Sequence, residues 1–117
     1  MNQQKKIEIL AEKVMNWYPK DQLGWFSEED GFEVLRSEWN PYENIEDAWN
    51  LVERIKLNWD IGFRLDGNNY IMNIFLFEQD NPEVINGSGK TAQEAICEAA
   101  LKWINEASTS SEAQPSP

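Results

Sequence analysis

The sequence contains no histidine and a single cysteine, Cys97. Without histidine the chain has no imidazole for acid-base catalysis, no Ser-His or Cys-His nucleophile pair, and none of the side chain on which most zinc and copper sites depend. One cysteine cannot form a disulfide within the chain, which is typical of proteins from a reducing compartment. We therefore expect a protein that is not an enzyme and that holds no metal ion or other cofactor.

Basic residues are scarce as well, because 10 Lys and Arg stand against 21 Asp and Glu, a formal net charge of −11. Such a surface repels the phosphates of nucleic acids and the headgroups of anionic lipids. No apolar run approaches the ~18 residues of a transmembrane helix, and Glu8 and Glu12 interrupt the only apolar stretch near the N-terminus. We expect no direct nucleic-acid binding, no membrane association and a location in the cytoplasm.

What the sequence does contain is enough apolar material for one packed domain. Hydrophobic residues make up 41% of the chain and include six tryptophans, too many for a disordered chain of this charge. Near the C-terminus the composition changes to serine, glutamine, glutamate and proline, which cannot bury a core. We predict a single domain over residues 1–107 and a disordered tail over residues 108–117.

Apolar residues at spacings of three and four predict three amphipathic helices. The first covers residues 4–18 and is stopped by Pro19. The second covers residues 44–56, where Asn44 followed by Asp47 resembles a helix-capping pair. The third begins after Thr91, in a stretch rich in alanine that also holds the cysteine, which we expect to be small and buried.

Strict alternation of apolar and polar residues predicts a strand at 59–66, followed by a hairpin turn at Asp66–Asn69. The returning strand at 70–77 is apolar on both alternating sets, so we expect a helical layer above it and another below it. A short strand at 31–36 completes the set. The predicted fold is α+β, a three-layer α/β/α sandwich with one small antiparallel sheet of about three strands covered by three helices.

The tripeptide Gly89-Lys90-Thr91, at the start of the third helix, matches the end of a phosphate-binding loop motif. That motif requires a glycine where this chain has Val84. Thr91 and Glu94 instead have the spacing of a capping box, which predicts a helix start. Glu94 and Glu98 also stand where a double-stranded-RNA-binding domain would need lysines, so RNA binding is not expected either.

Two groups of carboxylates could in principle act in catalysis or hold Mg²⁺. Glu28, Glu29 and Asp30 are consecutive, whereas Asp60 and Asp66 lie on one predicted strand. Charge runs of this kind are usually solvated surfaces. We interpret the first group as a charged loop and the second as the wet face of a strand.

The tryptophans divide into two groups by their position in the predicted elements. Four lie on apolar faces and are predicted to be core: Trp17, Trp49, Trp59 and Trp103. Trp25 and Trp39 lie in the irregular segment over residues 20–43, where nothing predicts burial. Because tryptophan is enriched at interface hot spots, these two are candidates for surface anchors at a binding site.

Two stretches resemble the phage ABA sandwich domain, a family of small phage and prophage proteins. One runs from Trp39 to Trp49, with Asn-Pro ahead of a helix that carries Ala-Trp, and the other is the Thr91–Leu101 stretch with its Ala-Ile-Cys and Ala-Ala-Leu triplets. The resemblance covers roughly residues 1 to 107. It implies helices on both sides of an antiparallel sheet, and it brings no catalytic residues.

The leading hypothesis is a non-enzymatic accessory protein of a phage or prophage that binds a host or phage protein in the host cytoplasm. In its sharper form the acidic face engages a basic partner. The alternative is a small-ligand binder or carboxylate-dependent hydrolase that uses residues 23–43 as a lid, and it requires a pocket of at least ~300 Å³. Its candidate residues are Trp25, Trp39, Glu28, Glu29 and Asp30. A third possibility is self-association through an exposed strand edge.

Overall fold

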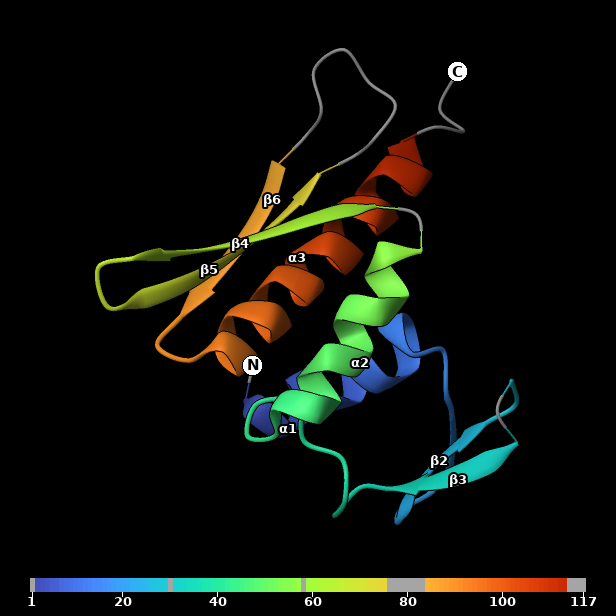
Figure 1. Cartoon of the computed structure of the whole chain (residues 1–117). Helices are drawn as coiled ribbons and strands as arrows, with labels where there is room; N and C mark the ends of the chain where they lie inside the picture. The colour runs from blue at the N-terminus through green and yellow to red at the C-terminus, as the bar shows by residue number, and fades with distance from the viewer. Residues whose placement is uncertain (1, 30, 58, 76–83, 114–117) are drawn as a thin grey trace.

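The computed structural model describes residues 2–29, 31–57, 59–75 and 84–113 (Figure 1). The helices are α1 (Gln3–Ile9), its π-helical continuation η1 (Leu10–Val14), α2 (Ile45–Lys56) and α3 (Ala92–Ala113). The strands are β1 (Tyr18–Asp21), β2 (Gly24–Ser27), β3 (Phe32–Leu35), β4 (Asp60–Asp66), β5 (Asn69–Phe75) and β6 (Val84–Gly89). A helix followed by a three-stranded antiparallel meander therefore occurs twice before α3: the first sheet is β1-β2-β3 and the second sheet is β4-β5-β6.

The first helical segment buries one face, as its periodicity predicts. Ile7, Leu10, Ala11 and Val14 belong to the core. The helix does not extend to Pro19, because Asn16 adopts a φ of 64° and turns the chain out of it. Asparagine tolerates this left-handed conformation better than most residues do. The part of the prediction that placed residues 17 and 18 in the helix is therefore wrong.

The first sheet occupies much of residues 20–43, a segment predicted to be largely irregular. The predicted strand at 31–36 is confirmed as β3, but β1 and β2 were missed. All four residues of β1 are exposed and one of them is proline, so this strand shows no alternation of apolar and polar residues. β2 is the central strand, with β1 and β3 paired antiparallel on either side of it.

Helix α2 begins where predicted. The side chain of Asn44 accepts hydrogen bonds from the backbone N–H groups of Glu46 at 2.9 Å and of Asp47 at 3.4 Å. Asp47 does not complete a capping pair with Asn44, because its carboxylate accepts a hydrogen bond from the backbone of Asn40 at 2.9 Å. The loop before α2 and the first turn of the helix are thereby tied together.

The predicted hairpin is confirmed as β4 and β5, with Asp66 paired to Asn69 across a two-residue turn. Gly67 has a φ of 65°, which glycine adopts at little cost. The third strand of this sheet is β6, not the strand at 31–36, so the prediction of one sheet is wrong. Residues 76 and 77, the predicted end of the returning strand, lie outside the described residues.

The second sheet has one buried face among the described residues. Met72 and Ile74 of β5 have no exposed surface and pair with Gly87 and Ile85 of β6. On the opposite face, Asn86 and Ser88 of β6 are exposed and the side chains of β5 are only half-buried. The structure therefore does not show the expected helical layer on this second face.

Helix α3 covers the buried face of the second sheet at very short range. A Cβ atom built on Gly87 would lie 2.1 Å from the backbone nitrogen and 2.6 Å from the Cα atom of Ala99. Thr91 caps the helix, because its hydroxyl oxygen accepts a hydrogen bond from the backbone N–H of Glu94 at 3.1 Å, as predicted. The helix continues to Ala113, six residues into the segment for which we predicted a tail, and residues 114–117 lie outside the described residues.

The helices lie between the two sheets, with the second sheet at the upper left and the first sheet at the lower right of Figure 1. Polar contacts from the first sheet and its flanking turns to the helices include Trp25 to Glu12, Arg36 to Glu8 and Glu29 to Arg54. The α+β class is confirmed, but the layers are not those of one sheet with helices on both sides. Among the described residues, no helix combines the length and the apolar composition that crossing a bilayer requires.

Gly87→Ala should destabilise the protein by about 3 kcal/mol or more, because the added methyl group would overlap the backbone of α3. Gly62→Ala is the matched control, since a Cβ atom there would lie 3.5 Å from Cε2 of Phe75, an ordinary contact. This control should change the free energy of unfolding by less than about 1 kcal/mol. Urea unfolding of both variants measures the difference, and equal stabilities would contradict the close packing of α3 on β6.

Candidate functional site

The two tryptophans that we expected to be surface anchors are core residues. Trp25 is fully buried and Trp39 is 3% exposed. Together with Trp17 they form a cluster in which ring centroids lie 5.0 to 6.1 Å apart. The expectation that Trp25 and Trp39 lie at the surface is therefore wrong.

The burial of Trp25 follows from its place on the central strand of the first sheet. Its indole N–H donates to the carboxylate of Glu12 on η1 at 3.2 Å, and the guanidinium of Arg36 stacks over its ring at 4.5 Å. The indole thus joins the first sheet to the first helical segment. A ring with these contacts is not available to a partner.

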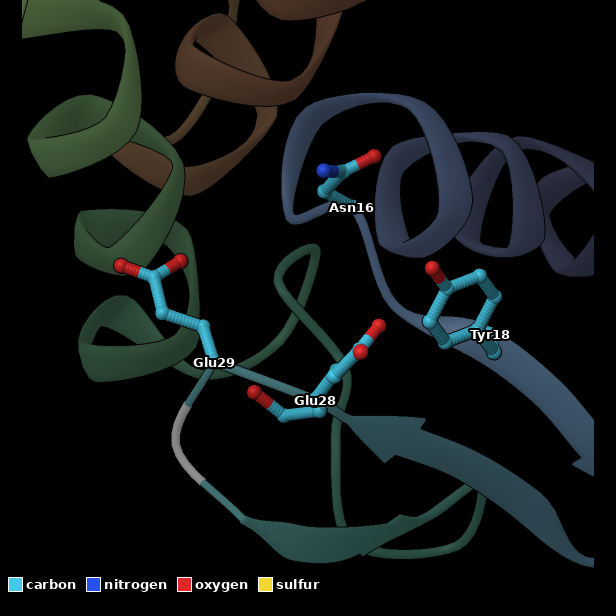
Figure 2. Close-up of a pocket in the computed structure, with 5 residues that line it drawn as sticks. Asn16, Tyr18, Glu28 and Glu29 are labelled. Carbon is cyan, nitrogen blue, oxygen red and sulfur yellow. The ribbon is translucent and has the colours of Figure 1, made fainter.

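The charged turn after β2 borders a small pocket (Figure 2). Its volume is about 230 Å³, and it is lined by Asn16, Tyr18, Ser27, Glu28 and Glu29. Tyr18 donates a hydrogen bond to the carboxylate of Glu28, and this bond, with the negative charge beside it, raises the pKa of the phenol. Figure 2 shows the carboxylate of Glu28 directed toward Tyr18.

This pocket does not support the alternative of a ligand binder or hydrolase. Its volume lies below the ~300 Å³ of ordinary small-molecule sites, and the tryptophans assigned to it do not line it. Glu29 turns toward α2, where it forms an ion pair with Arg54 at 2.8 Å. Asp30, the third carboxylate of the group, lies outside the described residues.

The second carboxylate pair is also unsuited to a shared reaction. Asp60 and Asp66 stand at the two ends of β4 and both are exposed. Six residues of extended strand separate them by about 20 Å, well beyond the spacing at which two carboxylates act on one bond. Within the described residues, no three side chains of Asp, Glu or Cys come together as a set that could hold a metal ion.

A larger opening lies between α2 and the outer strand β4, and we name it the α2–β4 groove. Its volume is about 470 Å³. Its lining consists of Trp49, Val52, Lys56, Trp59, Asp60, Ile61 and Phe63. Five of these seven residues are apolar, so the groove differs in kind from the acidic pocket at the first sheet.

Two aromatic rings form the exposed walls of the groove. Trp49 on α2 is 44% exposed and Phe63 on β4 is 46% exposed, and their rings stack at a centroid distance of 6.0 Å and an interplanar angle of 21°. The indole N–H of Trp49 donates to Glu53 at 3.0 Å, which holds the ring at the rim. Our prediction that Trp49 belongs to the core is wrong, whereas Trp17 is buried as predicted.

The apolar surface continues from the groove along the hairpin. Leu65 on β4 is 65% exposed, and Tyr70 on β5, directly opposite it, is 40% exposed. By the alternation of the strands, both side chains lie on the same face as Phe63. Trp59, at the other end of the groove, is half-buried and contacts Trp103 of α3 edge to face at 6.1 Å.

A polar cluster beneath α3 has a structural role. The hydroxyl of Tyr42 donates to Glu98 at 2.7 Å, and Lys6 forms an ion pair with the same carboxylate oxygen at 3.3 Å. Burial raises the pKa of Tyr42, and the hydrogen bond to Glu98 adds to the shift. The neighbouring thiol of Cys97 is buried as predicted, and its burial likewise raises its pKa. A thiol in this state is a poor nucleophile.

Comparisons with known proteins agree with the fold. A model of the phage ABA sandwich domain family matches residues 8–101. The crystal structure of a phage protein from Bacillus cereus superimposes with a TM-score of 0.67, at 20% identity, over 90% of this chain and 89% of that one. No curated protein matches the sequence. At this identity the structural likeness supports the fold alone.

The buried thiol of Cys97 and the half-buried phenol of Tyr42 predict loss of stability at alkaline pH. Their ordinary pKa values are 9.0 for Cys97 and 10.0 for Tyr42, and both are raised in the folded protein. As the pH increases, the unfolded chain therefore loses these protons first, so their contribution is full below about pH 9 and declines above it. Each group lowers the free energy of unfolding by at most about 1.4 kcal/mol per pH unit.

Urea unfolding between about pH 8 and pH 10.5 measures this decline. Tyr42→Phe should make it shallower, because one of the two groups no longer titrates. A variant that loses stability as steeply as the wild type would contradict the assignment to Tyr42.

Trp25→Ala and Trp49→Ala should lower the stability by different amounts, because Trp25 belongs to the core and Trp49 lines the groove. Removing the fully buried ring of Trp25 should cost about 3–5 kcal/mol of stability. Removing the half-exposed ring of Trp49 should cost only about 2 kcal/mol, because little more than half of its surface is withdrawn from water. Equal losses in urea unfolding would mean that the groove is part of the core.

Proposed function

The chain belongs to the phage ABA sandwich domain family, and from that premise we propose that it is a small, non-enzymatic phage or prophage protein that binds another protein in the host cytoplasm. The observation that carries the proposal is the α2–β4 groove. Trp49 and Phe63 leave nearly half of their surface in water although both stand beside a well-packed core. Exposed aromatic surface with a polar rim is typical of protein interaction sites.

The charge of the chain favours a basic partner. A net charge of −11 attracts cationic proteins and accelerates their association, and salt weakens that attraction. The cytoplasm is the compartment that suits a single cysteine held in a buried, reduced form. A basic host protein is therefore the partner class that we expect.

The groove supports a protein partner better than a small ligand. Small-molecule sites enclose most of the surface of their ligand, whereas the two aromatic walls here are 44% and 46% exposed. An open groove of this kind suits a side chain presented by another protein. The ligand-binding or hydrolase alternative depended on residues 23–43, and the opening that Glu28 and Glu29 line there measures about 230 Å³.

Affinity capture from host lysate tests the proposal. The wild-type protein should retain a partner at about 50 mM salt and lose most of it at about 500 mM salt, where surface charges are screened. Trp49→Ser should reduce retention about fivefold at about 50 mM salt, because it removes one of the two exposed aromatic rings of the groove.

Leu57→Ser is the matched control, since Leu57 is 72% exposed and does not line the groove. This variant should retain the partner as the wild type does. Retention of a partner that depends neither on the salt concentration nor on Trp49 would contradict the proposal.

A further inference from the structure

The outer edge of β4 is open to pairing. In the second sheet β4 pairs with β5 on one side, and no described strand pairs with it on the other. The backbone N–H and C=O groups along such an edge can accept a further strand. The α2–β4 groove lies along this edge, because Asp60, Ile61 and Phe63 belong to both.

The helices above the sheet are wider than the sheet itself. Helix α3 packs on β5 and β6, whereas α2 lies beside α3 and meets the sheet at β4. A helix is about 10 Å wide and neighbouring strands are about 4.8 Å apart, so two helices cover about four strands. The described residues give the second sheet three. Space for one more strand therefore remains under α2, next to β4.

We propose that an extended segment of the partner pairs with the outer edge of β4 and becomes the fourth strand of the second sheet. This inference rests on the proposed function and identifies the mode of binding at the same groove. In an added strand alternate side chains point to one face. Those that face α2 enter the groove beside the stacked rings of Trp49 and Phe63 and must be apolar.

The other alternate side chains of the segment are basic where they meet the ends of β4. Asp60 and Asp66 stand at these ends, with Arg64 between them, and all three are exposed. Opposite charges at directly paired positions stabilise a sheet, and like charges destabilise it. A lysine or arginine opposite each aspartate matches the strand, as the net charge of −11 also demands.

A second copy of the chain fits this edge poorly. Each copy carries a net charge of −11, so two copies repel each other, and pairing of two β4 strands around Phe63 would also set Asp60 of each copy opposite Asp66 of the other. Trp49, Phe63, Leu65 and Tyr70 together expose roughly 400 Å² of side-chain surface, about half of what each partner contributes to a stable interface. The surface suits a short segment of a basic protein and not a dimer of acidic chains.

Titration with a synthetic peptide tests the proposal. The probe is a blocked peptide of about nine residues, enough to span β4, in which valine alternates with lysine except that threonine stands opposite Arg64. It should shift the backbone amide NMR signals of β4 and of Trp49, and the same peptide with glutamate for lysine should not bind. N-methylation of the amides that would pair with β4 should weaken binding at least about tenfold, because charge and valine side chains are kept while hydrogen bonds are lost.

Protein variants supply the second arm of the test. Trp49→Ser should weaken peptide binding about fivefold, and Leu57→Ser, outside the groove, should leave it unchanged. An N-methylated peptide that binds as tightly as its parent, or shifts confined to the first sheet, would overturn strand addition.

The two proposals can fail separately. If the peptide does not pair with β4 but capture from lysate still depends on Trp49, strand addition is wrong and the proposed function stands. If the peptide pairs with β4 but no partner is captured, the proposed function is wrong.

Discussion

The close contact of α3 with β6 sets the arrangement of the whole molecule. Because Gly87 has no side chain, the backbone of α3 at Ala99 lies directly on the strand, and the helix takes the centre of the buried face. Helix α2 must then lie to one side, over the outer strand β4. The alanines of α3 permit the same closeness, since Ala95, Ala99 and Ala100 are all buried. The groove is the consequence of this lateral position of α2.

Helices and the central hairpin could be predicted from the sequence because their signals are local. Asn44 and Thr91 cap helices where the spacing of polar and apolar residues says they should. The second sheet could not be completed from sequence, because β6 contains two glycines and resembles a loop. Its pairing depends on α3, which lies later in the chain and packs on Gly87.

Which tryptophans are exposed could not be predicted from the sequence for a related reason. Trp25 lies on β2, whose neighbours β1 and β3 are mostly exposed. No alternation of apolar and polar residues in this segment therefore predicts that the central strand is buried. Trp49 lies at the edge of the apolar stripe of α2, and its exposure depends on how far the sheet extends beneath it. The apolar stripe of α2 is wider than one neighbouring element can cover, because it includes Trp49 as well as Ala48, Leu51, Val52 and Ile55. This width is the feature of the sequence that indicates exposure at the edge of the stripe.

Fluorine NMR of the protein labelled with 5-fluorotryptophan tests most directly which aromatic surface is open. A soluble gadolinium chelate broadens the signals of rings that it can approach. The structure predicts strong broadening for Trp49 and sharp signals for Trp17, Trp25 and Trp39, which are at most 5% exposed. Broadening of Trp25 or Trp39 to the extent of Trp49, or a protected Trp49, would contradict the account.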